Sequence, residues 1–150
     1  MAMNWLKENI TKARENLTAE VAKFKNRSFM EAVVAGCALV AAADGSVDAS
    51  EKQKMAAFLE RSDELKHFDI REVIEVFNKA VGDFEFDQAI GKTNALQTIS
   101  KVRGKDDQAR VIVRVVCAIG AADGDFDDDE KAVVREIAQE LGLKPEEFDL

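Results

Sequence analysis

The sequence has 150 residues, of which 47% are hydrophobic and 33% charged, and its net charge is −8. This length favours a single domain with a sizeable core, and the apolar content excludes a disordered chain. The acidic balance argues against nucleic acid as a partner, because phosphates attract basic surfaces.

A basic amphipathic helix is predicted over residues 4–25, where apolar residues recur every three or four positions. Residues 1–27 carry six basic and three acidic side chains, so this segment has a charge of +3 and the remaining chain −11. Such a helix can pack on the core with a solvated basic face, which is the favoured interpretation. It can also associate peripherally with anionic lipid or with a partner.

The next segment, residues 29–43, is apolar on nearly every face, which predicts a central helix opened by a capping box of Ser28 and Glu31. Its apolar run is too short to span a bilayer. A third helix follows, capped by Asp48 with Glu51.

Further helices are predicted along the rest of the chain, with a break at 82–87 and a polar turn at 103–107. In chain order they cover residues 70–81, 88–102, 109–122 and 130–141, and a short last helix begins at Pro145. Asp69 with Glu72 forms a capping box, and Gly142 is suited to end a helix. The β-branched run ARVIVRVV is ambiguous, but Arg110 and Arg114 share one helical face, so helix is favoured.

Two acidic elements stand 79 residues apart, AADGSVDASEK at 42–52 and AADGDFDDDEK at 121–131. At each one an apolar helix enters and a capped amphipathic helix leaves. We therefore predict an all-α fold, a single compact domain of about seven helices. Its two pseudo-symmetric helix–turn–helix halves should cover residues 28–82 and 106–150.

Local helix physics explains part of each acidic element. A glycine ends the entering helix, and an aspartate–glutamate pair caps the leaving one. It does not explain Asp44 and Asp123, which are expected in the last turn of a helix, at the negative end of its dipole. That placement costs up to about 1 kcal/mol, and a bound cation would turn it into a ligand set.

The second element is not an EF-hand, although aspartates occupy positions one, three and five of the loop pattern. Asp128 stands where that pattern needs glycine, and Val134 where it needs glutamate. All candidate ligands are carboxylates, which select calcium or magnesium over zinc or copper. One turn offers few ligands, so strong binding would need both elements to converge, or water or a partner to complete the shell.

A recognisable pattern runs through the chain: the paired AADG elements, NRSFMEAVVAGCALVAAADG, SEKQKMAAFLERSDELKHFD, REVIEVFNKAVGDFEFD and DGDFDDDEKAVVREIAQELGLKPEEFDL. Over essentially its full length the chain resembles the tellurite-resistance TerB family. The resemblance implies an all-helical domain of two related halves without an assigned enzymatic activity. It also implies metal binding at Asp44, Asp48, Glu51, Asp123, Asp127 and Glu130.

The same resemblance implies partners and a location. The family is linked to the membrane protein TerC and to calcium-binding TerD-type proteins, in a complex at the inner face of the membrane. The first acidic element lacks three acids that enrich the second, having Ser46, Ala49 and Ser50 in their places. Equal affinity at the two elements is therefore not expected.

Thiols react with tellurite, so Cys37 and Cys117 invite a redox interpretation. Each lies in a very apolar predicted helix, which favours an inert core residue, and the wide spacing of the two cysteines fits a reducing cytoplasm. The single histidine, His67, has no cysteine or second histidine near it in sequence and is expected at the surface.

We expect a cytoplasmic, non-enzymatic stress-response protein that binds calcium, or magnesium, through its acidic turns and acts through protein partners, with no organic cofactor. The alternative is a structural adaptor whose acidic surface binds a basic partner without metal. An enzyme acting on tellurium oxyanions is disfavoured, because no motif supplies a site and a negative protein repels such substrates.

Overall fold

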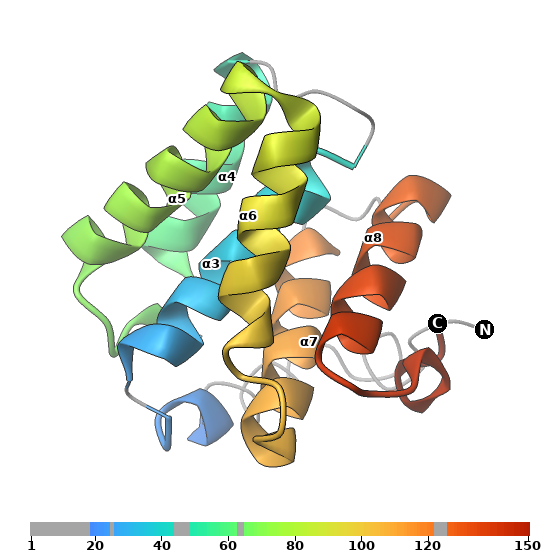
Figure 1. Ribbon diagram of the computed structural model, residues 1–150. Coiled ribbons are helices and arrows are strands. Elements are labelled where there is room, and N and C mark those ends of the chain that lie inside the picture. Colours follow the sequence, from blue (N-terminus) through green and yellow to red (C-terminus); the bar gives the residue numbers. More distant parts are fainter. Residues whose placement is uncertain (1–18, 25, 44–48, 63–64, 122–125) are drawn as a thin grey trace.

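The computed structural model describes residues 19–24, 26–43, 49–62, 65–121 and 126–150, and everything below refers to them. Within these ranges the fold is all-α without strands, which confirms the predicted class (Figure 1). Both ends are described for α3 (Arg27–Ala41), α4 (Ala49–Arg61), α5 (Ile70–Phe86), α6 (Gln88–Ser100), α7 (Asp106–Gly120), α8 (Asp128–Glu140) and the 3-10 helix η2 (Pro145–Phe148).

The predicted basic helix over residues 4–25 lies mostly outside the described residues. Of its described part, residues 19–21 are helical and a turn follows, so the helix ends earlier than predicted. Val21 is fully buried, and the ring of Phe24 lies 5.6 Å from that of Phe29. This end of the segment therefore packs on the core.

Helix α3 is the central element, as its apolar sequence predicts. It contacts α4, α5, α6, α7 and α8, and its residues 32–40 are all buried. In Figure 1, α4 and α5 lie on one side of the molecule and α7 and α8 on the other. The backbone of α3 lies close to a side chain of α7 at Gly36, where an added Cβ would lie 2.7 Å from Cγ2 of Val116.

The start of α3 differs from the prediction. Asn26, not Ser28, is the N-cap, and its side-chain oxygen accepts from the backbone N–H of Phe29 at 2.8 Å. Ser28 lies inside the first turn. Glu31, expected to complete a capping box, instead faces Arg27 at 3.4 Å. An asparagine two residues upstream caps as well as a serine, so the sequence pattern did not decide between them.

The predicted break at 82–87 is wrong, because α5 continues through Gly82 to Phe86. One glycine costs a helix only about 1 kcal/mol, and the last turn of α5 is held by contacts within the helix and with the rest of the fold. The side chain of Phe84 is buried, and the carboxylate of Asp83 accepts from Lys79 and Asn94. Asp87 then turns the chain and caps α6 at Ile90 N–H.

Helix α7 begins at Asp106, three residues before its predicted start, while α6 ends at Ser100, two residues before its predicted end. Asp106 and Asp107 occupy the first turn of α7, where the helix dipole favours negative charge. The ARVIVRVV run, residues 109–116, is helical, as predicted. Arg110 and Arg114 lie on its half-exposed face and reach Glu147 at 3.0 Å and Glu20 at 3.9 Å.

The C-terminal end of α8 follows the predicted pattern. Gly142 has φ +78°, and the hydrogen bonds of Gly142 and Leu143 to Gln139 and Ala138, at 3.0 and 2.9 Å, form a Schellman motif. Pro145 then opens η2, which buries Phe148. None of the described helices is long and apolar enough to cross a membrane.

Candidate functional site

The two acidic elements begin from the same local structure. The backbone N–H of Ala42 bonds to the carbonyl of Ala38 at 3.0 Å, and that of Ala121 bonds to the carbonyl of Cys117 at 2.9 Å. The two bonds are related by the same 79-residue shift as the sequences. The ends of α3 and α7 thus repeat one another, while the full division into halves at 28–82 and 106–150 stays a prediction.

Helices α3 and α7 end shortly before Asp44 and Asp123. α3 ends at Ala41 and α7 at Gly120, and each aspartate comes three positions later in sequence. Asp44 and Asp123 themselves lie outside the described residues, as does Asp48.

The start of α8 carries the predicted capping box. Asp127 Oδ1 accepts from the N–H of Glu130 at 2.8 Å, and Glu130 Oε1 accepts from the N–H of Asp127 at 3.1 Å. Each of these bonds engages one oxygen of a carboxylate that has about four lone-pair sites. Capping and cation coordination can therefore coexist. Glu51 lies in the first turn of α4, but its side chain is not among those that the structure describes.

Phe126 anchors the second acidic element to the end of α7. Its ring is partly buried against the core, and an added Cβ on Gly120 would lie 2.8 Å from its Cε2 atom. The glycine before this element therefore also serves packing, because the ring needs the space that a side chain would fill.

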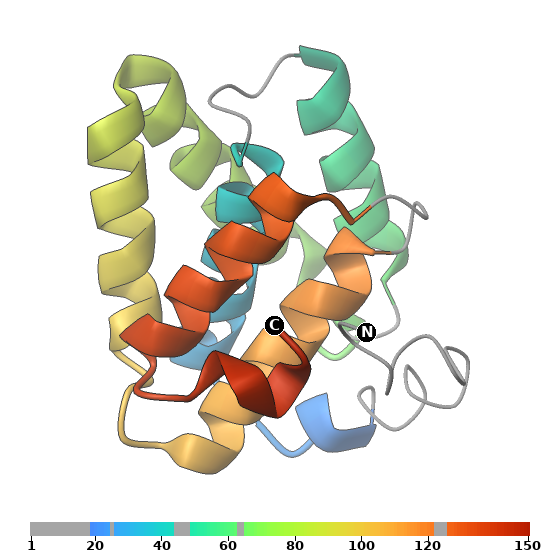
Figure 2. The same cartoon turned by 90° about the vertical axis from the view of Figure 1, so that its right-hand side faces the viewer.

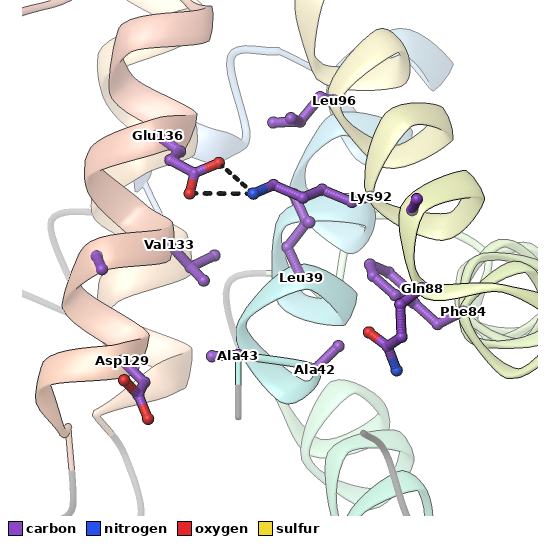
Figure 3. A pocket seen from close by; sticks show the side chains of 12 residues that line it. Leu39, Ala42, Ala43, Phe84, Gln88, Lys92, Leu96, Asp129, Val133 and Glu136 are labelled. Atoms are coloured by element: carbon purple, nitrogen blue, oxygen red, sulfur yellow. Dashed lines mark hydrogen bonds and ion pairs between the residues drawn. The ribbon is translucent and has the colours of Figure 1, made fainter. Parts of the chain in front are cut away.

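A groove of about 370 Å³ lies between α6 and α8, with the end of α3 as its floor (Figure 3). Ala42 and Ala43, at the start of the first acidic element, and Asp129, in the second, all line it. Residues of the two elements therefore meet at one groove. The sequence carried no signal for this, since the helices that form it are brought together only by tertiary packing.

An ion pair crosses the groove from α6 to α8. Lys92 Nζ lies 2.9 and 3.2 Å from the two carboxylate oxygens of Glu136, and both side chains are about half exposed, at 50% and 45% (Figure 3). The two residues are 44 positions apart, so helical periodicity could not reveal the pair.

Metal coordination is not visible among the residues that the structure describes, since no three His, Cys, Asp or Glu side chains among them are grouped as a metal site requires. Three of the six predicted ligands lie outside those residues. The cation site accordingly stays a prediction.

Both cysteines belong to the core. Cys37 is 1% exposed and Cys117 is fully buried, and burial raises the pKa of the Cys117 thiol to about 12. The thiolate is the reactive form of cysteine, so this pKa suppresses the reactivity of Cys117 at neutral pH. The core interpretation is confirmed. His67 is exposed in the turn before α5, as expected.

These features define a class of protein: an all-helical domain packed around a central apolar helix, with two acidic sequence elements that each follow an apolar helix. The family described as "Tellurite resistance protein TerB" matches residues 30–150, and the chain belongs to it. A "Tellurium resistance protein TerB" from Alcaligenes sp is 44% identical over 110 residues, which cover 73% of this chain and 90% of that relative. Neither name describes an enzyme. No solved structure matches the chain.

Proposed function

We propose that this chain acts in tellurite resistance as a non-enzymatic cytoplasmic protein that binds a divalent cation and works through protein partners. Calcium is the foremost candidate and magnesium the alternative. The ligands would come from both acidic elements, at Asp44, Asp48, Glu51, Asp123, Asp127 and Glu130. By family resemblance, the partners would be TerC and TerD-type proteins at the inner face of the membrane.

One observation carries the proposal: residues from both acidic elements, Ala42 and Ala43 from the first and Asp129 from the second, line the same groove. Ala43, which lines it, directly precedes Asp44 in sequence, and Asp129 lies two residues after Asp127. In Figure 2 the last turn of α3 and the first turn of α8 lie toward the same end of the molecule. Calcium takes six to eight oxygen ligands, more than one short turn offers. Two elements at one end of the bundle could supply such a shell together.

The proposed mechanism is charge neutralisation. A cation bound there would offset the crowded carboxylates and fix the first turn of α8 relative to the end of α3. Because Asp127 and Glu130 already hold the backbone of that turn, coordination by either would connect the ion rigidly to α8. The surface next to the groove would then change in both charge and shape.

The alternative is an adaptor that uses its acidic surface without metal. The observation in its favour is the capping box, because a structural role alone accounts for Asp127 and Glu130.

A calcium titration of the whole protein, by calorimetry or by NMR, separates the two functions. We expect saturable binding that Asp123→Asn weakens far more than Asp149→Asn. Asp149 is a matched control: it lies beyond the other end of α8 with φ 59°, a left-handed conformation that asparagine also tolerates. Absence of any saturable heat or shift up to millimolar calcium, and likewise with magnesium, would eliminate the cation and leave the adaptor.

A further inference from the structure

We propose that the groove between α6 and α8 is the docking site for a basic amphipathic helix of a partner protein. The inference rests on the proposed function in one respect only, that the chain works through a partner. It does not require the cation.

One face of α6 and one face of α8 form the groove, and they lie opposite each other across the end of α3. On α8 the lining residues are spaced as one face of a helix, at positions 129, 132, 133 and 136, and on α6 at positions 88, 89, 92 and 96. Small side chains keep the space open, namely Ala42 and Ala43 on the floor and Ala89 and Ala132 on the walls.

The lining is apolar at depth and polar at the rim. Leu39 and Phe84 are almost fully buried, at 4% and 5% exposure, and Leu96 and Val133 are partly buried against the core. Binding grooves for amphipathic helices share this pattern, in which apolar anchors enter the groove and polar residues meet the rim.

The dimensions suit a helix. Asp129 and Glu136 are seven residues apart on α8, which corresponds to about 10 Å or two helical turns. A docked helix would place anchors from successive turns along this length. The volume of about 370 Å³ is close to the lower end for ligand sites, which suits a few apolar side chains better than a large organic cofactor.

The charged side chains at the rim of the groove favour a basic partner. Lys92 is the basic residue that lines the groove, and Glu136 neutralises it, while Asp129 adds a further negative charge. At the start of α8, Asp127, Asp128 and Glu130 are acidic as well, against one basic residue, Lys131. Complementary charge speeds association and excludes like-charged partners, so a lysine- or arginine-bearing helix is favoured over an acidic one.

The ion pair between Lys92 and Glu136 is easily exchanged. Both side chains are about half exposed, and exposed ion pairs contribute little to stability. An incoming lysine or arginine can therefore replace Lys92 as the partner of Glu136. This exchange would widen the mouth of the groove, because the pair spans it (Figure 3).

The first test uses an amphipathic leucine–lysine peptide of about four helical turns as the probe. Titrated into the full-length isotope-labelled protein, it should produce saturable NMR shifts at the groove, with the largest changes at Ala42, Ala89, Ala132 and Val133. The same peptide with glutamate in place of lysine should not bind. Failure of the lysine peptide to saturate at millimolar concentration, or shifts located elsewhere, would overturn the proposal.

Variants then distinguish the groove from general attraction to an acidic protein. Ala132→Leu fills the groove from α8 with a good helix former and should weaken binding about tenfold. Ala89→Leu does so from α6, where the position is exposed, in case the first variant is poorly folded. Glu136→Gln should weaken binding more than Glu75→Gln, which makes the same charge change on the exposed face of α5. Equal effects of the two charge variants, or full affinity with a filled groove, would contradict the site.

The titrations are repeated in calcium and in a chelator. If the peptide binds the groove but calcium does not bind at all, the cation part of the proposed function fails and the docking site stands. If calcium binds and the peptide does not, the docking site fails alone. Groove shifts that appear when the protein itself is concentrated, without peptide, would show a second copy as occupant and overturn the choice of partner.

Discussion

Asp127 holds the first turn of α8 through a hydrogen bond that an asparagine side chain can also make. Its Oδ1 atom accepts from Glu130 N–H at 2.8 Å, and asparagine is about as good an N-cap as aspartate. What asparagine lacks is the negative charge that a calcium ligand supplies. The structural and the proposed cation-binding roles of this residue are therefore separable.

We predict that, without calcium, Asp127→Ala lowers the free energy of unfolding by about 1 kcal/mol, whereas Asp127→Asn changes it by less than about 0.5 kcal/mol. Urea denaturation measures both. In a calcium titration, Asp127→Asn should nevertheless weaken binding about tenfold, because a charged ligand is lost. Unchanged calcium affinity in the asparagine variant would remove Asp127 from the ligand set and leave it as a cap only.

Two glycines at the junction of α5 and α6 have opposite roles. Gly82 lies within α5 and has open space around the position of a Cβ, with no heavy atom within 4 Å. Gly91, in α6, is buried against α5, and an added Cβ would lie 2.7 Å from the backbone Cα of Phe84. Backbone cannot move aside as a flexible side chain can, so α6 needs glycine there.

We therefore predict that Gly82→Ala raises the free energy of unfolding by about 0.5 to 1 kcal/mol, because alanine favours a helix and loses less entropy on folding. Gly91→Ala should lower it by about 1 to 3 kcal/mol through overpacking. Chemical denaturation of the two variants, with the helix content checked by circular dichroism, gives the comparison. A destabilising Gly82→Ala would indicate that the chain does break at 82–87, as the sequence pattern suggests.

The helices show which structural features the sequence pattern can predict and which it cannot. The apolar runs of α3 and α7, the α8 capping box and the ending at Gly142 were predictable, because each depends on residues within a few positions of one another. The α3 cap was missed because Asn26 and Ser28 are both good N-caps. The α5 break was a wrong prediction because burial of Phe84 outweighs the low helix propensity of one glycine.

The candidate site was predictable only in its local part. Its acidic residues could be found from composition and spacing, because they recur after 79 positions. The groove and the Lys92–Glu136 pair depend on how α6 and α8 pack on α3, and no pattern within one helix encodes that geometry. The acidic residues of each element are close together in sequence and could be predicted, whereas the residues of the groove are far apart in sequence and could not.

Across the whole molecule, the net charge of −8 affects stability in two separable ways. Like charges repel one another in the compact state, and any salt screens that repulsion. A specific cation would add a second, saturable term, because a ligand that binds only the folded state stabilises it by mass action. Calcium and sodium chloride of equal ionic strength should therefore differ in their effect.

We predict that calcium at about one hundred times its dissociation constant stabilises the folded protein by about 2.7 kcal/mol. For a chain of this size, that corresponds to a rise in Tm of about 5 to 10 °C. Thermal unfolding followed by circular dichroism provides the measurement, with sodium chloride of equal ionic strength as the control for screening. In Asp127→Asn, which keeps the cap, the calcium-specific rise should shrink while the sodium chloride effect persists. Equal rises with both salts would mean that calcium only screens charge, and the acidic elements would then act by helix capping and by attracting a basic partner.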